Sequence, residues 1–462
     1  MDVKKCSRRD FLKALSVAAA SSAFTGCHGA SQPVSRGSGG KKPNIIIILA
    51  DDLGYGDLTC YGSKIINTPN IDALAAGGLR FTDFHSNGPM CSPTRASLLT
   101  GRYQQRCGIE GVLSGKSNYD TGMALEQVTF AEVLKQVGYT SGCFGKWHLG
   151  YKPTFNPVRQ GFDTYRGFVA GGSDYFSHID RSGRPDWWKD DKLFAEEGYT
   201  TNLLTDHAIE LIEANHNRPF CVYLPYQSVH FPFQGPNDQA DRSVGGSYWS
   251  KAKYGRRYED VEDRKAAYKE MTESMDANVG RIVDKVRQLG IEKDTLIFFA
   301  SDNGAYSWVG TNLPCSGQKT ELLEGGHRVP AIAYWPGTVK GGTTTDETVM
   351  TMDLFPTMVE MTKAPMPKEL KLDGVSILSL LTRNKPLPKR TLFWRFRKQS
   401  AVRKGPWKLY VKGQQQHLYN LTDDIGEKTD LAAQKPDMVA ALRAEYLAWE
   451  KDVTTGVKWI RK

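Results

Sequence analysis

Short apolar runs alternate with amphipathic segments from residue 42 onward. The first run, residues 44–49, contains four consecutive isoleucines, so both of its faces are apolar and β-branched, as a central strand requires. The segments between the runs carry helix-end signals: Thr129 can cap a helix through Val137, and a helix over residues 266–289 ends at Gly290. This alternation predicts an α/β fold with a large, mainly parallel sheet sandwiched by helices. The other expected strands are residues 139–144, 220–224, 295–300 and 331–334.

The pattern changes after residue 385. Residues 391–396, 401–411 and 417–421 are expected to form an antiparallel meander, broken by Lys404-Gly405-Pro406 and Lys412-Gly413. Pro436 then begins a closing helix that runs to about Asp452. We therefore expect a large domain over residues 43–385 and a small α+β subdomain over residues 386–462.

The first residues indicate an export signal. Arg8 and Arg9 form a twin-arginine pattern, and the apolar run after them is too short to cross a bilayer as a mature helix. Thr25-Gly26-Cys27 resembles a lipoprotein processing site, so Cys27 is a candidate for lipidation; alternatively, Cys27 is incidental to a cleaved signal. We expect a twin-arginine signal peptide of lipoprotein type over residues 1–27 and a flexible linker over residues 28–42.

This leader implies export through the twin-arginine (Tat) machinery to the periplasm or to an anchored position on the outer membrane or cell surface. Membrane contact is expected only through a lipid anchor. The formal net charge is +9, of which residues 1–42 carry +6, because this segment contains eight Lys and Arg residues and two Asp residues. The remaining body is weakly basic, which suits an anionic substrate and gives no argument for nucleic acid.

The cysteines outside the leader do not have the spacing of a zinc site. Apart from Cys91, most are expected to be small buried apolar residues, and the sequence assigns no disulfide. These cysteines are Cys60, Cys107, Cys143, Cys221 and Cys315.

Acidic and amide side chains follow two of the expected strands. Asp51 and Asp52 follow the isoleucine strand, and Asp302 and Asn303 follow the strand at residues 295–300. Parallel strands meet at their carboxyl ends, where open α/β sheets bind ligands. A pair of aspartates after a strand is by itself usually a turn or cap, but two such pairs that offer only oxygen favour calcium or magnesium over zinc. Lys146, His148 and His230 follow two further strands and are candidates for the same site.

Cys91 is expected at a helix N-terminus, because Pro93 fits the first turn and Gly101 fits the end. Free N–H groups at such a position favour an anion. The cysteine could be a capping or core residue, or a thiolate nucleophile with a lowered pKa.

Cys91-x-Pro93-x-Arg95, followed by Leu-Thr-Gly-Arg, resembles the signature of the formylglycine-dependent (type I) sulfatases of the alkaline phosphatase superfamily. The resemblance extends over nearly the whole chain after the leader, and its details are similar to the branch of arylsulfatases A and B and N-acetylgalactosamine-6-sulfatase. The other matching motifs are residues 51–57, 145–148, 174–178, 301–304, 317–319, 324–326 and 401–409. The resemblance implies an alkaline phosphatase-like fold and a catalytic sulfatase domain over residues 43–385.

The resemblance also implies a role for each matching residue. A maturation enzyme would oxidise Cys91 to formylglycine (3-oxoalanine), whose hydrated aldehyde is the nucleophile. Arg95 would hold this diol, Lys146 and Lys319 would bind sulfate oxygens, His230 with Lys319 would protonate the leaving sugar oxygen, and His148 would deprotonate the second hydroxyl. One calcium ion would be held by Asp51, Asp52, Asp302, Asn303 and the modified Cys91.

Sequence alone says less about the substrate. Trp187 and Trp188 could stack on a sugar ring or pack a long loop, and Asp174 and His178 could line the sugar pocket or fix a turn. Export and the family branch suggest a sulfated polysaccharide fragment, with galactose or N-acetylgalactosamine sulfate as candidate units. The remaining histidines are interpreted as structural: His85, His207, His216 and His417, with His327 as a packing or wall residue.

Two competing functions stay open at this point. One is a phosphodiesterase or phosphonate monoester hydrolase of the same superfamily. The other is a surface lipoprotein that binds sulfated glycans without turnover, although a binding protein has no need for the complete catalytic set.

Overall fold

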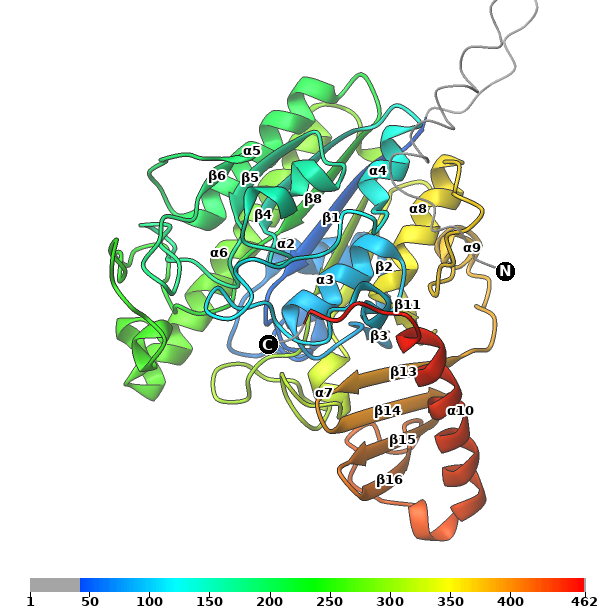
Figure 1. The fold of residues 1–462 in the computed structure, drawn as a ribbon. Helices are drawn as coiled ribbons and strands as arrows, with labels where there is room; N and C mark the ends of the chain where they lie inside the picture. Colours follow the sequence, from blue (N-terminus) through cyan, green and yellow to red (C-terminus); the bar gives the residue numbers. More distant parts are fainter. Residues whose placement is uncertain (1–41, 461–462) are drawn as a thin grey trace, which may run out of the picture.

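The computed structural model describes residues 42–460; the predicted signal peptide, Cys27 and the linker up to residue 41 lie outside the described residues. A ten-stranded sheet runs through the larger part of the chain, with strand order β11-β2-β10-β9-β1-β8-β4-β5-β6-β7 (Figure 1). Its strands are β1 (Asn44–Ala50), β2 (Leu79–Phe81), β4 (Thr140–Lys146), β5 (Thr164–Phe168), β6 (Trp188–Lys189), β7 (Lys192–Leu193), β8 (Phe220–Pro225), β9 (Thr295–Ser301), β10 (Ala331–Tyr334) and β11 (Thr343–Thr345).

The isoleucine strand β1 lies at the centre of this sheet, parallel to β8 on one side and to β9 on the other. Ile45 and Ile47 pack into the hydrophobic cluster on one face, and Ile46 and Ile48 pack into the cluster on the other face. Helices cover both faces, which confirms the predicted α/β class. The first cluster contains residues of α3 (Cys91–Thr100), α4 (Phe130–Lys135), α8 (Leu354–Thr362) and α9 (Leu378–Arg383); the second contains residues of α2 (Pro69–Gly77), α5 (Thr200–Asn215) and α6 (Val261–Gln288).

Two helix boundaries differ from the sequence prediction. Thr129 does cap α4, in a capping box with Glu132, but the α-helix ends at Lys135, because the amides of residues 136–138 bond to carbonyls three residues back. The long helix α6 begins at Val261 rather than near residue 266. The Asp260 carboxylate caps it there by accepting the N–H groups of the second and third helical residues.

The C-terminal part of the chain forms the expected antiparallel sheet and closing helix. Four antiparallel strands are covered by one long helix, and together they enclose a third hydrophobic cluster. Within residues 42–460, no helix combines the length and apolar character needed to cross a bilayer. The elements are β13 (Thr391–Phe396), β14 (Gln399–Lys404), β15 (Trp407–Lys412), β16 (Gln415–Asn420) and α10 (Pro436–Thr454), while β3 (Phe84–His85) and β12 (Val349–Met350) form a separate parallel pair.

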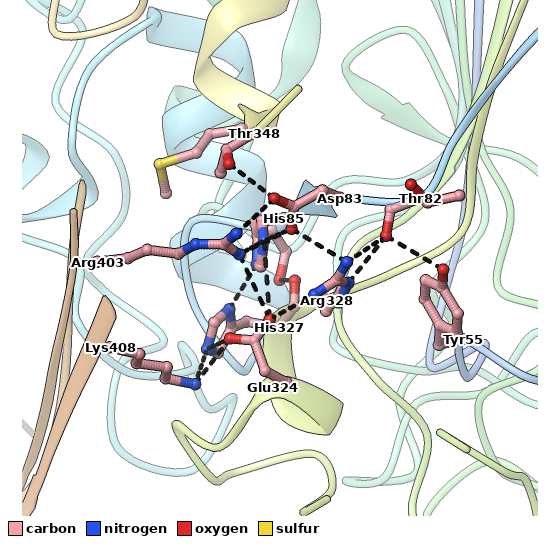
Figure 2. Close-up of polar contacts among 12 residues, drawn as sticks. Tyr55, Thr82, Asp83, His85, Glu324, His327, Arg328, Thr348, Arg403 and Lys408 are labelled. Atoms are coloured by element: carbon pink, nitrogen blue, oxygen red, sulfur yellow. Dashed lines mark hydrogen bonds and ion pairs between the residues drawn. The ribbon is translucent and has the colours of Figure 1, made fainter. Parts of the chain in front are cut away.

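A buried polar network joins this subdomain to the large domain (Figure 2). Arg403 from β14 pairs with Asp83 at 2.7 Å, and Lys408 from β15 lies 2.8 Å from Glu324, the first residue of the short helix α7 (Glu324–His327). His85 and His327 contact each other through their Nδ1 atoms at 2.9 Å between these ion pairs. His327 is therefore a packing residue, as predicted. Ion pairs as well as apolar contacts hold β3, α7 and the C-terminal sheet together.

Candidate active site

Polar side chains from the ends of four strands meet at the carboxyl edge of the large sheet. They are joined there by two residues of α3 and by one lysine from the loop that precedes α7. The structure thus brings together every catalytic and metal-binding candidate taken from the sequence, and all of these residues are buried. They are Asp51, Asp52, Cys91, Arg95, Lys146, His148, His230, Asp302, Asn303 and Lys319.

Three carboxylates form the floor of the site. Asp51, Asp52 and Asp302 each present an oxygen, and these atoms all lie within 4.8 Å of one another. Asp52 adopts a left-handed backbone conformation with φ 64°, and its amide donates to Asp302 at 3.2 Å. Left-handed backbone is uncommon outside glycine and is enriched at functional sites, where the surrounding structure maintains it.

Three buried cations balance these carboxylates. Lys146 Nζ lies 2.5 Å from Asp51, and Arg95 Nη2 lies 2.7 Å from Asp302. Lys319 Nζ contacts the carboxylate of Asp52. Burial raises the pKa of Asp51, and the neighbouring Asp302 charge adds to this effect. Burial also opposes ionisation of Asp302, but the charges of Arg95, Lys146 and Lys319 outweigh it and lower the pKa of Asp302.

The donor set fits a hard divalent cation. Asn303 donates its side-chain N–H to Asp52 at 2.8 Å, while its carbonyl oxygen is buried and accepts no hydrogen bond within the described residues. An orphaned buried carbonyl oxygen beside three converging carboxylates is a costly arrangement without a ligand, and oxygen is the donor that calcium and magnesium prefer. Asp51, Asp52, Asp302 and Asn303 can therefore hold such an ion.

Cys91 is the first residue of α3 and is 1% exposed. Its Sγ lies 3.6 Å from Asp51 Oδ1 and 3.5 Å from Lys319 Nζ. Burial raises the pKa of the Cys91 thiol to about 12, although Lys146 and Lys319 lower it in part. In the unmodified residue, burial therefore disfavours the thiolate form, because desolvation outweighs the charges of the two lysines.

The two histidines present different nitrogens to the site. His148 Nε2 lies 2.9 Å from the Leu113 carbonyl and must carry the proton, which leaves Nδ1 buried, unprotonated and without a partner among the described residues. His230 Nδ1 lies 2.6 Å from the Phe231 carbonyl, which leaves its Nε2 3.9 Å from Asp52. Burial first, and Lys146 next, lower both histidine pKa values well below the usual range, so both rings are neutral.

A cavity of about 260 Å³ opens above these groups. Cys91, His148, His230 and Lys319 form its inner end, where a small anion would meet them. The rest of the lining includes several residues that the sequence prediction missed, because they lie in segments without α or β periodicity and without a recognisable motif. These residues include Tyr151, Arg181, Trp249, Lys253 and Tyr306.

The four residues predicted to contact the sugar do not line this cavity. Trp187 and Trp188 are buried, and their indole N–H groups donate to Glu196 at 2.7 Å and to Asp186 at 2.8 Å. The predicted sugar-stacking pair is therefore wrong, and the packing role, which the sequence also allowed, is what the structure shows.

Asp174 and His178 are corrected in the same way. The Asp174 carboxylate accepts the amides of Phe176 and Ser177 and, through its other oxygen, the amides of residues 241 and 242. It fixes two loops and has no oxygen left for a sugar. His178 stacks on Trp187 with ring centroids 4.3 Å apart.

Comparison with known proteins places these features in a family. The sulfatase family model matches residues 43–364, and that of the N-sulphoglucosamine sulphohydrolase C-terminal region matches residues 318–446. Mouse (Mus musculus) N-acetylgalactosamine-6-sulfatase is 32% identical over 80% of this chain and 72% of its own length. Human (Homo sapiens) arylsulfatase A is 32% identical over 87% of each chain.

Solved structures agree with this placement. The crystal structure of Ps i-CgsB in complex with k-i-k-neocarrahexaose is similar with a TM-score of 0.81 and 30% identity, covering 91% of this chain and 95% of that one. Phosphonate monoester hydrolase of Agrobacterium radiobacter is similar with a TM-score of 0.65 over 89% of this chain and 96% of that one. At 19% identity, that likeness shows the shared fold alone.

Proposed function

The chain belongs to the sulfatase family, and from this premise we propose that it removes sulfate from a sulfated galactose-type carbohydrate through formylglycine at Cys91 and bound calcium. That it is a sulfuric ester hydrolase follows from the family. The finer proposal is supported above all by one observation: Cys91 begins a helix within 3.6 Å of Asp51 and 3.5 Å of Lys319, beside the carboxylate cluster.

The proposed modification accounts for the state of Cys91. A buried thiol whose pKa is raised to about 12 is a poor nucleophile at neutral pH. Conversion to formylglycine would replace it with an aldehyde whose hydrate offers one hydroxyl for attack and a second for release of sulfate. Asp51, Asp52, Asp302 and Asn303 would hold calcium, which would favour the ionised hydroxyl and offset charge on the transferring group.

The residues of this chain then position the sulfate and move protons. Lys146 and Lys319 would bind sulfate oxygens, and Arg95, held against Asp302 at 2.7 Å, would orient the hydroxyls at position 91. His148 would accept the proton of the second hydroxyl at Nδ1, because its Nε2 faces the Leu113 carbonyl.

Proton donation to the leaving sugar oxygen involves His230 and Lys319. His230 Nε2 carries no proton in the neutral ring, so His230 can donate only after gaining one, which the charge of a bound sulfate ester would favour. Burial opposes the charge on Lys319, but Asp52 outweighs it and raises the pKa of Lys319 well above its usual range. Lys319 therefore keeps its protons and can assist the leaving group.

A galactose-type substrate is proposed from the relatives. One is named N-acetylgalactosamine-6-sulfatase, and the structure of Ps i-CgsB was solved with k-i-k-neocarrahexaose. Export by the twin-arginine route, lipidation of Cys27 and maturation of Cys91 by a formylglycine-generating enzyme belong to the same proposal. Fractionation of the native host tests the location: mature protein found only in the cytosol would contradict it.

The central test combines chemistry and mass. Protein matured in a host with a formylglycine-generating enzyme should release inorganic sulfate from sulfated galactose or N-acetylgalactosamine oligosaccharides in the presence of calcium. Mass spectrometry of the peptide containing Cys91 should show the aldehyde, and Cys91→Ala should abolish turnover. Full turnover by Cys91→Ala, or an unmodified thiol in fully active protein, would overturn the proposed mechanism.

A further inference from the structure

Two cations at the mouth of the active-site cavity are not paired with carboxylates. Arg181 and Lys253 both line the cavity that contains Cys91, and across residues 42–460 neither lies within ion-pair distance of an acidic side chain. The catalytic cations differ in this respect, because Lys146, Arg95 and Lys319 each face an aspartate. The surplus positive charge of the cavity therefore lies in its outer part.

Aromatic rings hold both cations in place. The Arg181 guanidinium lies 4.4 Å from the ring centroid of Trp249, and Lys253 Nζ lies 4.5 Å from that of Tyr254. Both also lie 5.9 Å from the ring of Phe231, the residue that follows His230. Cation–π contact favours a cation while leaving its N–H donors free for a ligand.

Arg181 is only partly satisfied by the protein. Its Nε is buried and has no hydrogen-bond partner within the described residues, and burial lowers the pKa of its guanidinium. A desolvated cation with an unused donor is costly unless an anion compensates it. The one acidic residue of the cavity lining compensates the Arg181 charge only in part: Asp180 favours the charged guanidinium, but its carboxylate accepts two backbone amides and lies 3.3 Å from Arg184.

We propose that Arg181 and Lys253 form an anion subsite that binds a second acidic group of the substrate, a sulfate or a carboxylate, next to the sulfate being removed. This inference rests on the proposed function and narrows it. The preferred substrate is a sugar or short oligosaccharide that carries at least two negative groups. Guanidinium and ammonium groups pair with either anion, so the two sources share one recognition chemistry.

Matched substrates test the subsite. Purified, matured enzyme is given N-acetylgalactosamine 6-sulfate, N-acetylgalactosamine 4,6-disulfate, and a disaccharide of a uronic acid with N-acetylgalactosamine 6-sulfate. The same three compounds are also prepared with galactose in place of N-acetylgalactosamine. Wild-type kcat/KM should be roughly tenfold or more higher for one doubly anionic class than for its monosulfated partner, mainly through KM. If the disulfated substrate has the higher kcat/KM, the second group is a sulfate; if the uronic acid disaccharide has it, the second group is a carboxylate.

Variants then locate the effect. Arg181→Met and Lys253→Met should each reduce that preference by roughly tenfold, while Lys253→Arg should retain most of it. Lys251→Met removes an exposed lysine two positions away, which pairs with Glu259 at 3.8 Å and is absent from the cavity lining. This control should leave all substrates unaffected, which separates a subsite from a change in net charge.

The failure of the subsite can be distinguished from the failure of the proposed function. Sulfate release with no preference for a second anionic group, or an equal loss on all substrates in Arg181→Met and Lys253→Met, would overturn the subsite and leave the proposed function standing. No sulfate release from any of the compounds would count against the proposed function, and the subsite would fall with it.

Discussion

Lys408 Nζ lies 2.8 Å from Glu324 Oε1, and both side chains are fully buried between the C-terminal sheet and α7 (Figure 2). Lys408 also lies 2.8 Å from Glu427, so one ammonium serves two carboxylates. Glu324 begins the helix that follows the Lys319 loop, and the carbonyl of Gly326 in this helix accepts the amide of Gly304, the residue after Asn303. The subdomain is thereby connected to two loops of the active site.

Loss of this lysine should destabilise the protein strongly. Lys408→Met would leave Glu324 and Glu427 buried without their shared cation, and breaking a buried pair in this way costs about 3–5 kcal/mol. Urea denaturation of wild type and variant measures the difference. Lys404→Met is the matched control, because Lys404 on β14 pairs with Glu445 at the surface and should contribute less than about 1 kcal/mol. Equal effects of the two substitutions would contradict the role of the buried pair.

The sequence predicted the parts of this structure that depend on local pattern. Four isoleucines in a row predict a central strand, because β-branched apolar side chains on both faces suit a strand that is buried on both faces. Asp51 and Asp302 could be assigned to one site because parallel strands end at a common edge, and the pairing of β1 with β9 fulfils this condition.

Other features depend on contacts between distant segments. His85 and His327 are 242 residues apart, and nothing in either segment predicts that their rings meet. Arg181 lies in a loop without regular periodicity, and the rings of Phe231 and Trp249, which contact its guanidinium, come from positions more than 45 residues away in the chain. Trp187 was misassigned for a related reason. An aromatic pair in a polar segment suggests exposure, but in the fold Trp187 is buried and stacks on His178.

His178 should make stability depend on pH. Burial lowers its pKa from 6.5 to about 4. Between these values the unfolded chain binds more protons than the folded one, so this contribution to stability is present above pH 6.5 and is lost as pH falls toward 4. At pH 5 the loss should be about 2 kcal/mol relative to pH 7, at 1.36 kcal/mol per pH unit.

The variant His178→Asn tests this contribution. Asparagine suits the left-handed backbone at this position, where φ is 54°, and it does not titrate. The wild type should lose about 2 kcal/mol of unfolding free energy relative to the variant between pH 7 and pH 5. The difference between the two should be constant from pH 7 to pH 8. A difference that stays constant down to pH 5 would show that His178 is not held neutral.

Calcium should stabilise the protein through the carboxylate cluster. Asp51, Asp52 and Asp302 present oxygens within 4.8 Å of one another, and an ion that binds only the folded state stabilises it by RT ln(1 + [L]/Kd). At one hundred times the Kd this amounts to about 2.7 kcal/mol. After EDTA treatment and dialysis, calcium should therefore raise the melting temperature.

Asp302→Asn separates metal binding from general salt effects. This variant removes one charged ligand and leaves a side chain of the same size, so its melting temperature should respond much less to calcium. Metal analysis should also find less calcium bound per chain. Magnesium at equal concentration is the control for ionic strength and for ion selectivity. A wild-type melting temperature that does not change with either ion would exclude a divalent cation at this cluster.

Gly304 should be essential for the geometry of the same site. A Cβ at this position would lie 1.9 Å from the carbonyl oxygen of Gly325, which is backbone and cannot swing away. Gly304→Ala must therefore push apart α7 and the loop that carries Asp302 and Asn303. We expect a loss of more than about 2 kcal/mol in stability, comparable with overpacking in a core, together with weaker calcium binding.

Gly111→Ala is the matched control for Gly304→Ala. A Cβ at Gly111 would meet nothing within 4 Å, and the backbone there is not in the positive-φ region, so the change should leave stability within about 1 kcal/mol of wild type. Calcium titration followed by melting temperature reports both properties for each variant. If Gly304→Ala matched Gly111→Ala in both, the close approach of the two loops would not be what holds Asp302 and Asn303 in place. If Gly304→Ala lost stability but kept the full calcium response, the contact would serve the fold without positioning the ligands.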